Sequence, residues 1–178
     1  SIGYCTGSYG NIFKTQDGGE SWNKIYQDES QRLNHTGINF IHPDTGWIFG
    51  HIWLQDYGII FSTTNGGESF TEVYLDERIS SIHMFNSQYG FASTSQSNVP
   101  GYYQTVNGGI TWERVHDELV GTWEFYFLND SIGYAVGTHF YVTLDGGNRW
   151  NFISYPLGLL YHMDLKMVDQ DIGYLCGR

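Results

Sequence analysis

Acidic pairs recur at three equivalent positions along the chain. Paired carboxyl groups can either bind a ligand or catalyse a reaction. Each pair lies five or six residues after an aromatic side chain, at Asp28-Glu29, Asp76-Glu77 and Asp117-Glu118. Two carboxyl groups about 5 to 9.5 Å apart can serve as the acid and base of a glycosidase. On successive units of a repeat they would instead line a negative rim that attracts a cation or a basic peptide. Solvated loop charge on an acidic protein is the third interpretation, and the sequence leaves all three open.

Aromatic side chains near these pairs could stack on a sugar ring or pack against a protein. They are Trp53 and Tyr57 in the segment 51–57, where Asp56 adds a carboxylate. His139 lies in the corresponding segment of a later repeat, and we assign it to the same candidate binding face. The alternative is that Trp53 and Tyr57 only cover the end of a structural unit.

The most specific pattern in the chain is an eight-residue motif, Thr-x-Asp/Asn-Gly-Gly-x-x-aromatic, which occurs four times. Asp or Asn can accept backbone N–H bonds in a tight turn, and glycine tolerates the positive φ that such turns require. We therefore predict a structural turn at each copy in preference to a metal site at Asp17 and Asp145, because two of the four copies carry a neutral Asn. The motif residues are Thr15, Asp17, Gly19, Trp22, Thr63, Asn65, Gly67, Phe70, Thr105, Asn107, Gly109, Trp112, Thr143, Asp145, Gly147 and Trp150.

A second pattern, a glycine followed by an aromatic residue, gives the repeat its period. These glycines are Gly3, Gly46, Gly90, Gly133 and Gly173, and they lie 43, 44, 43 and 40 residues apart. Apolar residues six and eight positions before the last four of them predict a strand with one buried face. Three further strands are predicted in each unit. They lie at the glycine pattern, at the run before the motif threonine and at the segment after the motif aromatic. Four short strands at this period predict an all-β protein, a β-propeller of four-stranded antiparallel blades.

The repeat phase divides residues 1–178 into units of a single propeller segment. We expect strands two to four of one unit at 1–27, further units at 37–75, 79–116 and 122–154, and strands one and two of another at 162–178. A ring that closes on itself would not duplicate strand two. We therefore predict about four repeats of a six- to eight-bladed ring, completed by remaining blades. Closure of four blades alone, or with a second copy, is the alternative.

The motif Thr-x-Asp/Asn-Gly-Gly-x-Ser/Thr-Trp resembles the Asp-box (BNR) repeat of sialidases, sortilin-type receptors and xyloglucan-cleaving endoglucanases. The longer pattern from Gly3-Tyr4 to Trp22 is most similar to the photosystem II assembly factor repeat family. The resemblance implies the propeller fold, with the repeated residues as scaffold. It also implies a membrane-protein partner engaged through a positively charged patch, which does not fit this acidic chain. Sialidase activity is disfavoured because the arginine-containing signature of those enzymes is absent.

Composition restricts both the partner and the compartment. The net charge of −11 disfavours nucleic acids and anionic membranes and favours a basic partner. A charged fraction of only 15%, with 14 tyrosines and 23 glycines, is typical of an extracytoplasmic protein, which is secreted, on the cell surface or periplasmic. No segment approaches the roughly 18 apolar residues of a membrane span. Histidine spacing and glycine context predict no metal and no cofactor.

Two cysteines, Cys5 and Cys176, lie on predicted strands near the two ends of the sequence. Their registers relative to the repeat glycine differ, and such strands would be far apart in a larger ring. We predict two buried free thiols rather than a disulfide.

Loop lengths indicate where function resides. The distance from repeat glycine to motif threonine varies from 12 to 17, 15 and 10 residues along the chain, as is typical of loops that carry specificity. We predict a non-catalytic extracytoplasmic scaffold that recognises a protein or a glycan with these loops and with those that follow strand four. The alternative is a glycoside hydrolase of the xyloglucanase type, with its carboxyl groups on the same face.

Overall fold

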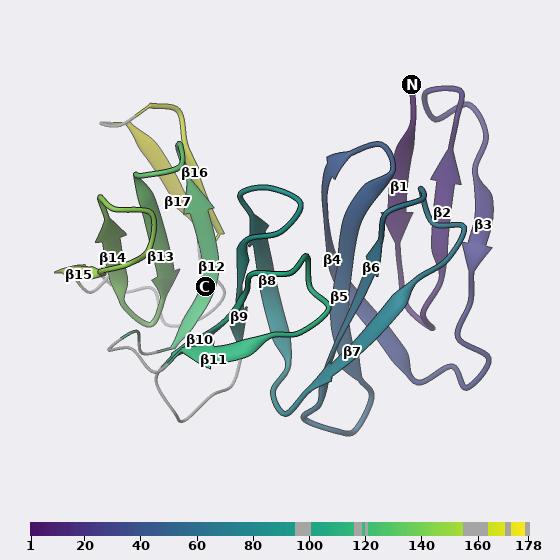
Figure 1. The fold of residues 1–178 in the computed structure, drawn as a ribbon, viewed down its shortest axis with the longest axis horizontal. Coiled ribbons are helices and arrows are strands. Elements are labelled where there is room, and N and C mark those ends of the chain that lie inside the picture. The colour runs from purple at the N-terminus through teal and green to yellow at the C-terminus, as the bar shows by residue number, and fades with distance from the viewer. Residues whose placement is uncertain (95–100, 116–118, 120, 155–163, 170–171, 177–178) are drawn as a thin grey trace.

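The computed structural model describes residues 1–94, 101–115, 119, 121–154, 164–169 and 172–176. All regular secondary structure in these ranges is strand, and the strands form five antiparallel sheets that stand side by side in chain order (Figure 1). Three sheets have four strands each, in the order in which they occur along the chain. The predicted all-β arrangement of four-stranded antiparallel blades is confirmed.

The strands have the following bounds. The first sheet contains β1 (Gly3–Thr6), β2 (Ile12–Thr15) and β3 (Asn23–Tyr26). The second contains β4 (Leu33–His42), β5 (Thr45–Ile52), β6 (Gly58–Thr63) and β7 (Thr71–Leu75). The third contains β8 (Ile79–Met84), β9 (Gly90–Thr94), β10 (Tyr102–Thr105) and β11 (Glu113–Val115). The fourth contains β12 (Thr122–Phe127), β13 (Gly133–Gly137), β14 (Phe140–Thr143) and β15 (Asn151–Ser154), and the fifth contains β16 (Asp164–Met167) and β17 (Gly173–Cys176).

The connections divide between two faces of this row of sheets. The motif hairpins lie with the turns that join strands one and two, and Gly66 N donates to Asp44 O at 2.9 Å between them. We call this the motif face, which is uppermost in Figure 1. The other connections that the structure describes lie on the opposite, variable-loop face, where Trp53 N donates to Arg32 O at 2.7 Å.

Steric crowding explains the repeat glycines. Gly46 pairs with Phe40 of β4 on one side and with Thr63 of β6 on the other. The Phe40 ring lies over the glycine, so that an added Cβ would stand only 2.4 Å from a ring atom. Gly133 has the same relation to Phe127, at 2.3 Å. A side chain at either glycine would therefore displace the large residue of strand one.

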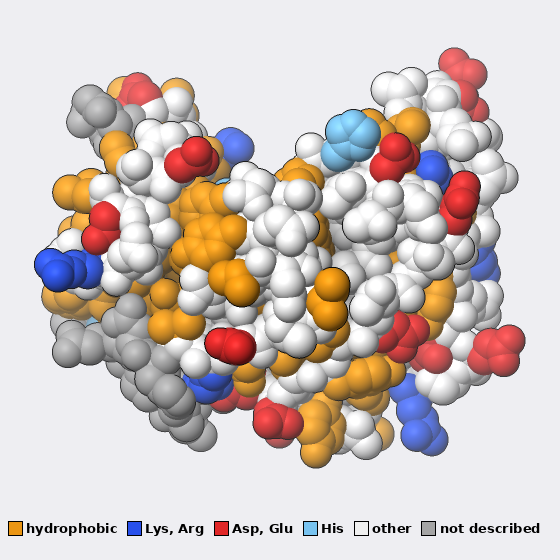
Figure 2. All heavy atoms as spheres, in the orientation of Figure 1, with side chains coloured by type: hydrophobic (Ala, Val, Ile, Leu, Met, Phe, Trp, Pro, Cys, Tyr) orange, Lys and Arg blue, Asp and Glu red, His pale blue; other side chains and the backbone are white. Residues whose placement is uncertain are grey.

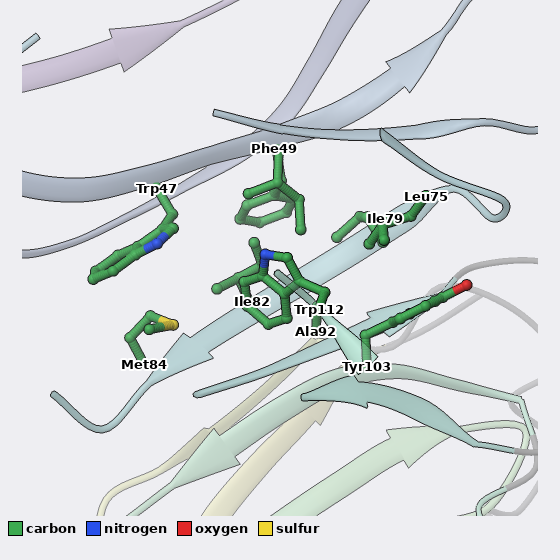
Figure 3. Packing of buried hydrophobic residues seen from close by; sticks show 10 residues of the cluster. Trp47, Phe49, Leu75, Ile79, Ile82, Met84, Ala92, Tyr103 and Trp112 are labelled. Atoms are coloured by element: carbon green, nitrogen blue, oxygen red, sulfur yellow. The ribbon is translucent and has the colours of Figure 1, made fainter. Parts of the chain in front are cut away.

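Adjacent sheets bury their aromatic side chains against each other, as Figure 3 shows for the second and third sheets. Trp47 and Phe49 of β5 pack against Ile82 and Met84 of β8, and the motif residue Trp112 is only 7% exposed. Burial of each large apolar side chain contributes about 1.5–3 kcal/mol, so these layers hold the sheets together.

The glycine pattern of one sheet also contacts the motif turn of the next. Trp47 Nε1 donates to Gly108 O at 2.9 Å, and Tyr4 Oη donates to Gly66 O at 3.0 Å. The two sequence patterns thus meet across each of these sheet boundaries. The motif aromatic of the first sheet, Trp22, is 42% exposed because the described chain places no sheet on that side of it.

The expectation of buried cysteines is wrong. Cys5 and Cys176 are both free and exposed. They lie on β1 and β17, in the first and last sheets, and each of these sheets has a described neighbour on one side only.

A histidine is buried in the interface between the first two sheets. His35 of β4 is 6% exposed, and its ring meets Phe61 edge-on with centroids 5.2 Å apart. Burial lowers the pKa of His35 to about 4, outweighing the attraction of the Asp28 charge. Burial also lowers the pKa of His83, on β8, to about 4.

Replacing Gly46 with Ala should destabilise the protein by about 1–3 kcal/mol, because the new methyl group must displace the Phe40 ring. Gly7 is the control, since an added Cβ there meets nothing within 4 Å. Gly7→Ala should change the free energy of unfolding by less than about 1 kcal/mol. Urea unfolding of the two variants tests this. Equal stabilities would refute the steric explanation of the repeat glycine.

Stability should fall as the pH drops from 6.5 towards 4. The unfolded chain binds protons at His35 and His83 in this window, while the folded chain keeps both rings neutral. Each histidine contributes a slope of about 1.4 kcal/mol per pH unit. In His35→Phe, urea unfolding at pH 7, 6 and 5 should show a smaller slope, whatever the absolute stability of the variant. An unchanged slope would contradict a neutral buried His35.

Candidate functional site

The motif residues build a hydrogen-bonded turn at the hairpin between strands three and four. In the second sheet the Thr63 hydroxyl donates to Asn65 Oδ1 at 2.9 Å and accepts the backbone N–H of Gly67 at 2.9 Å. Asn65 Oδ1 also accepts Ser69 N at 3.1 Å. The threonines of the other three motifs make the same two bonds, and Gly66 and Gly67 have φ of 71° and 85°. The structure therefore places these residues in the scaffold.

Asp and Asn are interchangeable in this turn because the neighbouring hydroxyl can reverse its role. Ser21 Oγ donates to Asp17 Oδ2 at 2.5 Å, whereas Ser69 Oγ accepts from Asn65 Nδ2 at 2.9 Å. Hydrogen bonds from Ser21 and Thr15 hold the pKa of Asp17 well below its usual range. The backbone N–H of Arg149 is the main cause of the lowered pKa of Asp145. Both carboxylates thus serve the turn.

The predicted aromatic residues lie exposed on the variable-loop face. Trp53 and Tyr57, in the connection between β5 and β6, are 50% and 49% exposed. The Trp53 ring stacks on Tyr9 of the first sheet's loop, with centroids 6.4 Å apart. Asp56 Oδ1 lies 3.3 Å from Arg78 Nε. An apolar surface with an ion pair at its side therefore spans the first two sheets.

The backbone of these loops is strained. Tyr9, Gln31 and Leu54 have φ of 61°, 57° and 63°, which are the positive φ values of non-glycine residues in the described ranges. All three lie in connections on the variable-loop face, and the Leu54 side chain is 97% exposed. Such strain persists only where the surroundings impose it, and it is concentrated at binding sites in proteins.

The acidic pairs differ in their surroundings. Asp28 accepts hydrogen bonds from Ser30, Arg32 and Leu33. Burial opposes ionisation of Asp28, but these bonds outweigh it and lower the pKa.

Glu77 accepts a hydrogen bond from the Arg114 guanidinium, which lies over the Tyr103 ring at 5.6 Å. Glu29 and Asp76 are exposed, and Asp117 and Glu118 lie outside the described residues. The structure thus uses Asp28 and Glu77 in internal contacts and leaves Glu29 and Asp76 facing solvent.

His139 lies two sheets away from the loop that carries Trp53 and Tyr57. It lies in the turn between β13 and β14, where Nδ1 is 2.8 Å from Thr138 Oγ1 and the ring stacks near Tyr141. His139 shares the variable-loop face with Trp53, but Trp53 belongs to the second sheet and His139 to the fourth.

Sequence reasoning missed a cleft between the outer strands of the first two sheets. Tyr26, Glu72 and Tyr74 line it together with Asp28 and other residues, and its volume is about 340 Å³. A signal was available, since both tyrosines stand four residues after a motif aromatic. Their convergence with Glu72 and Asp28 depends on how the sheets pack, which no periodicity encodes.

Acidic, basic and hydrophobic side chains lie next to one another along the lower edge of the molecule in Figure 2, which belongs to the variable-loop face. Among the described residues, none forms a helix long and apolar enough to span a membrane.

Loss of the motif hydroxyl should destabilise the fold. Thr63→Val removes the acceptor of the Gly67 N–H inside a buried turn and should cost about 1–3 kcal/mol. Thr71→Val, at an exposed position of β7, is the control. Asn65→Asp should change stability by less than about 0.5 kcal/mol, because Asp17 makes equivalent bonds in the first motif. Thermal unfolding measures all three, and a severe loss with Asn65→Asp would contradict the interchangeability.

Comparisons with known proteins agree with the architecture. A family model described as photosynthesis system II assembly factor YCF48 matches residues 1–126. A solved structure described as YCF48 bound to D1 peptide is 21% identical with a TM-score of 0.62, and the match covers 85% of this chain and 50% of that one. YCF48 from Cyanidioschyzon merolae is 16% identical with a TM-score of 0.66, covering 98% of this chain and 60% of that one. No curated protein sequence matches the chain.

The chain therefore spans half to three-fifths of the length of these solved relatives, as expected for part of a propeller. The resemblance inferred from the repeats is confirmed. Because the family model matches 126 of the 178 residues, the chain belongs to the photosynthesis system II assembly factor YCF48 family of BNR-type propellers.

Proposed function

We propose that this chain is a non-catalytic binding and assembly scaffold that holds a protein segment on its variable-loop face, outside the cytoplasm. The observation that carries the proposal is the exposed apolar set Tyr9, Trp53, Leu54 and Tyr57 on strained loops of two adjacent sheets. Exposed aromatic side chains on a rigid scaffold are typical anchors of protein interfaces.

The motif face has a different role. Its threonine, Asp or Asn, and glycine residues are engaged in turns and in contacts between sheets. The variable-loop face is where side chains differ from one repeat to the next. Binding specificity is therefore expected on that face.

Family membership supports an assembly role, since one solved relative is described as bound to a D1 peptide. The low charged fraction of 15% and the many tyrosines support the extracytoplasmic location. The stacked rings of Tyr9 and Trp53 would also suit a glycan, which is the competing ligand class.

Hydrolysis is less compatible with the electrostatics of the cleft. A glycosidase needs one carboxyl group that stays protonated until it donates to the leaving group. Asp28, which lines the cleft, is instead held ionised by hydrogen bonds from the backbone. Asp28 therefore does not fit the role of that acid.

Selection from a displayed library of random peptides tests the proposal. Peptides that bind the chain should lose at least tenfold in affinity with Trp53→Ala, as expected for an aromatic anchor. Leu144→Ala is the matched control, because Leu144 is 66% exposed in a motif turn on the opposite face. The affinities of the same peptides for Leu144→Ala should stay within twofold of those for the unmodified chain, as measured by biolayer interferometry.

Three outcomes would overturn the proposal. The selection could yield no binding peptide, the peptides could depend on Leu144 instead of Trp53, or xyloglucan oligosaccharides could bind at Trp53 while peptides do not. Turnover of an aryl glycoside by the purified chain would contradict its non-catalytic part.

A further inference from the structure

The cleft between the first two sheets has features of a site for one particular kind of side chain. It opens at the variable-loop end of the outer strands β3 and β7 and holds about 340 Å³. Its lining residues are Tyr26, Asp28, Ser30, Arg32, Leu33, Ile52, Gln55, Glu72 and Tyr74. We call it the tyrosine cleft.

Aromatic and aliphatic groups form one part of the tyrosine cleft. The Tyr26 ring is held edge-on against Phe61 and Phe70, with centroids 5.0 and 5.8 Å apart. Leu33 is buried and Tyr74 is 56% exposed. Part of the Tyr74 ring is thus open to a ligand, while Tyr26 is fixed by its neighbours. A long aliphatic stem ending in a cation fits such a lining, because aromatic rings attract cations over their faces.

Two carboxylates make the tyrosine cleft negative. Glu72 accepts a hydrogen bond from the Tyr74 hydroxyl at 3.1 Å and one from the Tyr26 hydroxyl at 3.5 Å, so its carboxylate is oriented by both rings. Asp28 is fixed by backbone N–H groups. Burial, followed by the charges of Glu72 and Asp28, raises the pKa of Tyr26 to about 12, in agreement with a negative environment.

One cation of the chain also lines the tyrosine cleft. Arg32 contributes its backbone N–H to Asp28 at 2.8 Å, and its charge offsets one of the two carboxylates. Nearby, Arg78 is paired with Asp56 at 3.3 Å. The lining therefore keeps one net negative charge on a protein whose net charge is −11. Charge complementarity selects a cationic occupant.

We propose that the tyrosine cleft receives a lysine or arginine side chain from a basic segment of the protein partner. This inference rests on the proposed function, because the cleft adjoins the exposed loop through Gln55, next to Leu54. The backbone of a bound segment would cross the apolar surface, and its basic side chain would enter between Tyr26 and Tyr74. The ammonium or guanidinium group donates to the carboxylate of Glu72.

Small probes can measure this site without an identified partner. N-acetyl-arginine amide and N-acetyl-lysine amide are titrated into the full chain at low salt, with N-acetyl-norleucine amide as the neutral comparison. NMR of the tyrosine ring and backbone resonances reports binding. A single anchoring side chain should bind with a millimolar Kd, and the neutral probe should bind at least tenfold more weakly.

Two variants locate the site. Glu72→Gln keeps the shape of the side chain and a hydrogen-bond acceptor but removes the charge. It should weaken binding of the cationic probes at least fivefold. Tyr74→Leu should weaken binding of these probes at least threefold, because it removes a ring face that the cation would contact. Tyr74 is 56% exposed, so the substitution is at a half-exposed position. Glu113→Gln is the matched control, since it removes an exposed charge on the outer strand of the third sheet. The Kd of the cationic probes for Glu113→Gln should stay within twofold of their Kd for the unmodified chain.

The proposal is overturned if cationic and neutral probes bind alike, if Glu72→Gln and Glu113→Gln have equal effects, or if the shifted resonances lie outside the cleft. Library peptides separate this failure from that of the proposed function. Peptides that need Trp53 but bind equally well to Glu72→Gln would refute the cleft and leave the scaffold function standing. Binding of the cationic probes with no selected peptide would support the cleft and refute the scaffold function.

Discussion

The contact between the motif turn of one sheet and the glycine pattern of the preceding sheet is the constraint on which the structure depends. Trp47 Nε1 and Tyr4 Oη each donate to a glycine carbonyl in the next sheet's turn. At the third boundary the Phe91 ring packs against Gly147 without a hydrogen bond. The two patterns recur with one period because each contacts the other at these three boundaries. A change in either would disturb the packing between sheets, where aromatic side chains such as Trp47, Phe49 and Trp112 are buried.

The contacts between sheets lie near the motif face, whereas the proposed binding face lies at the other end of the strands. The motif face is occupied by hydrogen-bonded turns whose residues have few alternatives. The variable-loop face carries the strained backbone of Gln31 and Leu54 and the exposed ring of Trp53. Loops can diverge in length and chemistry there without disturbing the boundaries between sheets, which explains how one fold family can serve different partners.

The fold could be predicted from the sequence because its determinants are local and repeated. A glycine beneath a large residue of strand one and a turn built by Thr63 and Asn65 both leave a fixed spacing in the chain. The tyrosines of the cleft recur at a fixed spacing, but the cleft itself does not follow from it, since Tyr26 and Glu72 lie 46 residues apart and meet only after two sheets pack. The exposure of Cys5 was missed for a similar reason, because it depends on the neighbours of a sheet rather than on strand register.

The net charge of the chain limits which partners can be inferred from its family membership. A net charge of −11 repels anionic surfaces and attracts basic ones, and the attraction extends about one Debye length, near 8 Å, from the surface at physiological salt. Asp28 contributes to that field in two ways, since it both closes the loop before β4 and lines the cleft. Its bonds to Arg32 and Leu33 keep it ionised, so the same contacts that fix the loop also maintain the charge that a basic segment would meet. On the proposed binding face, the charge that would meet a partner is thereby coupled to the structure of the loop.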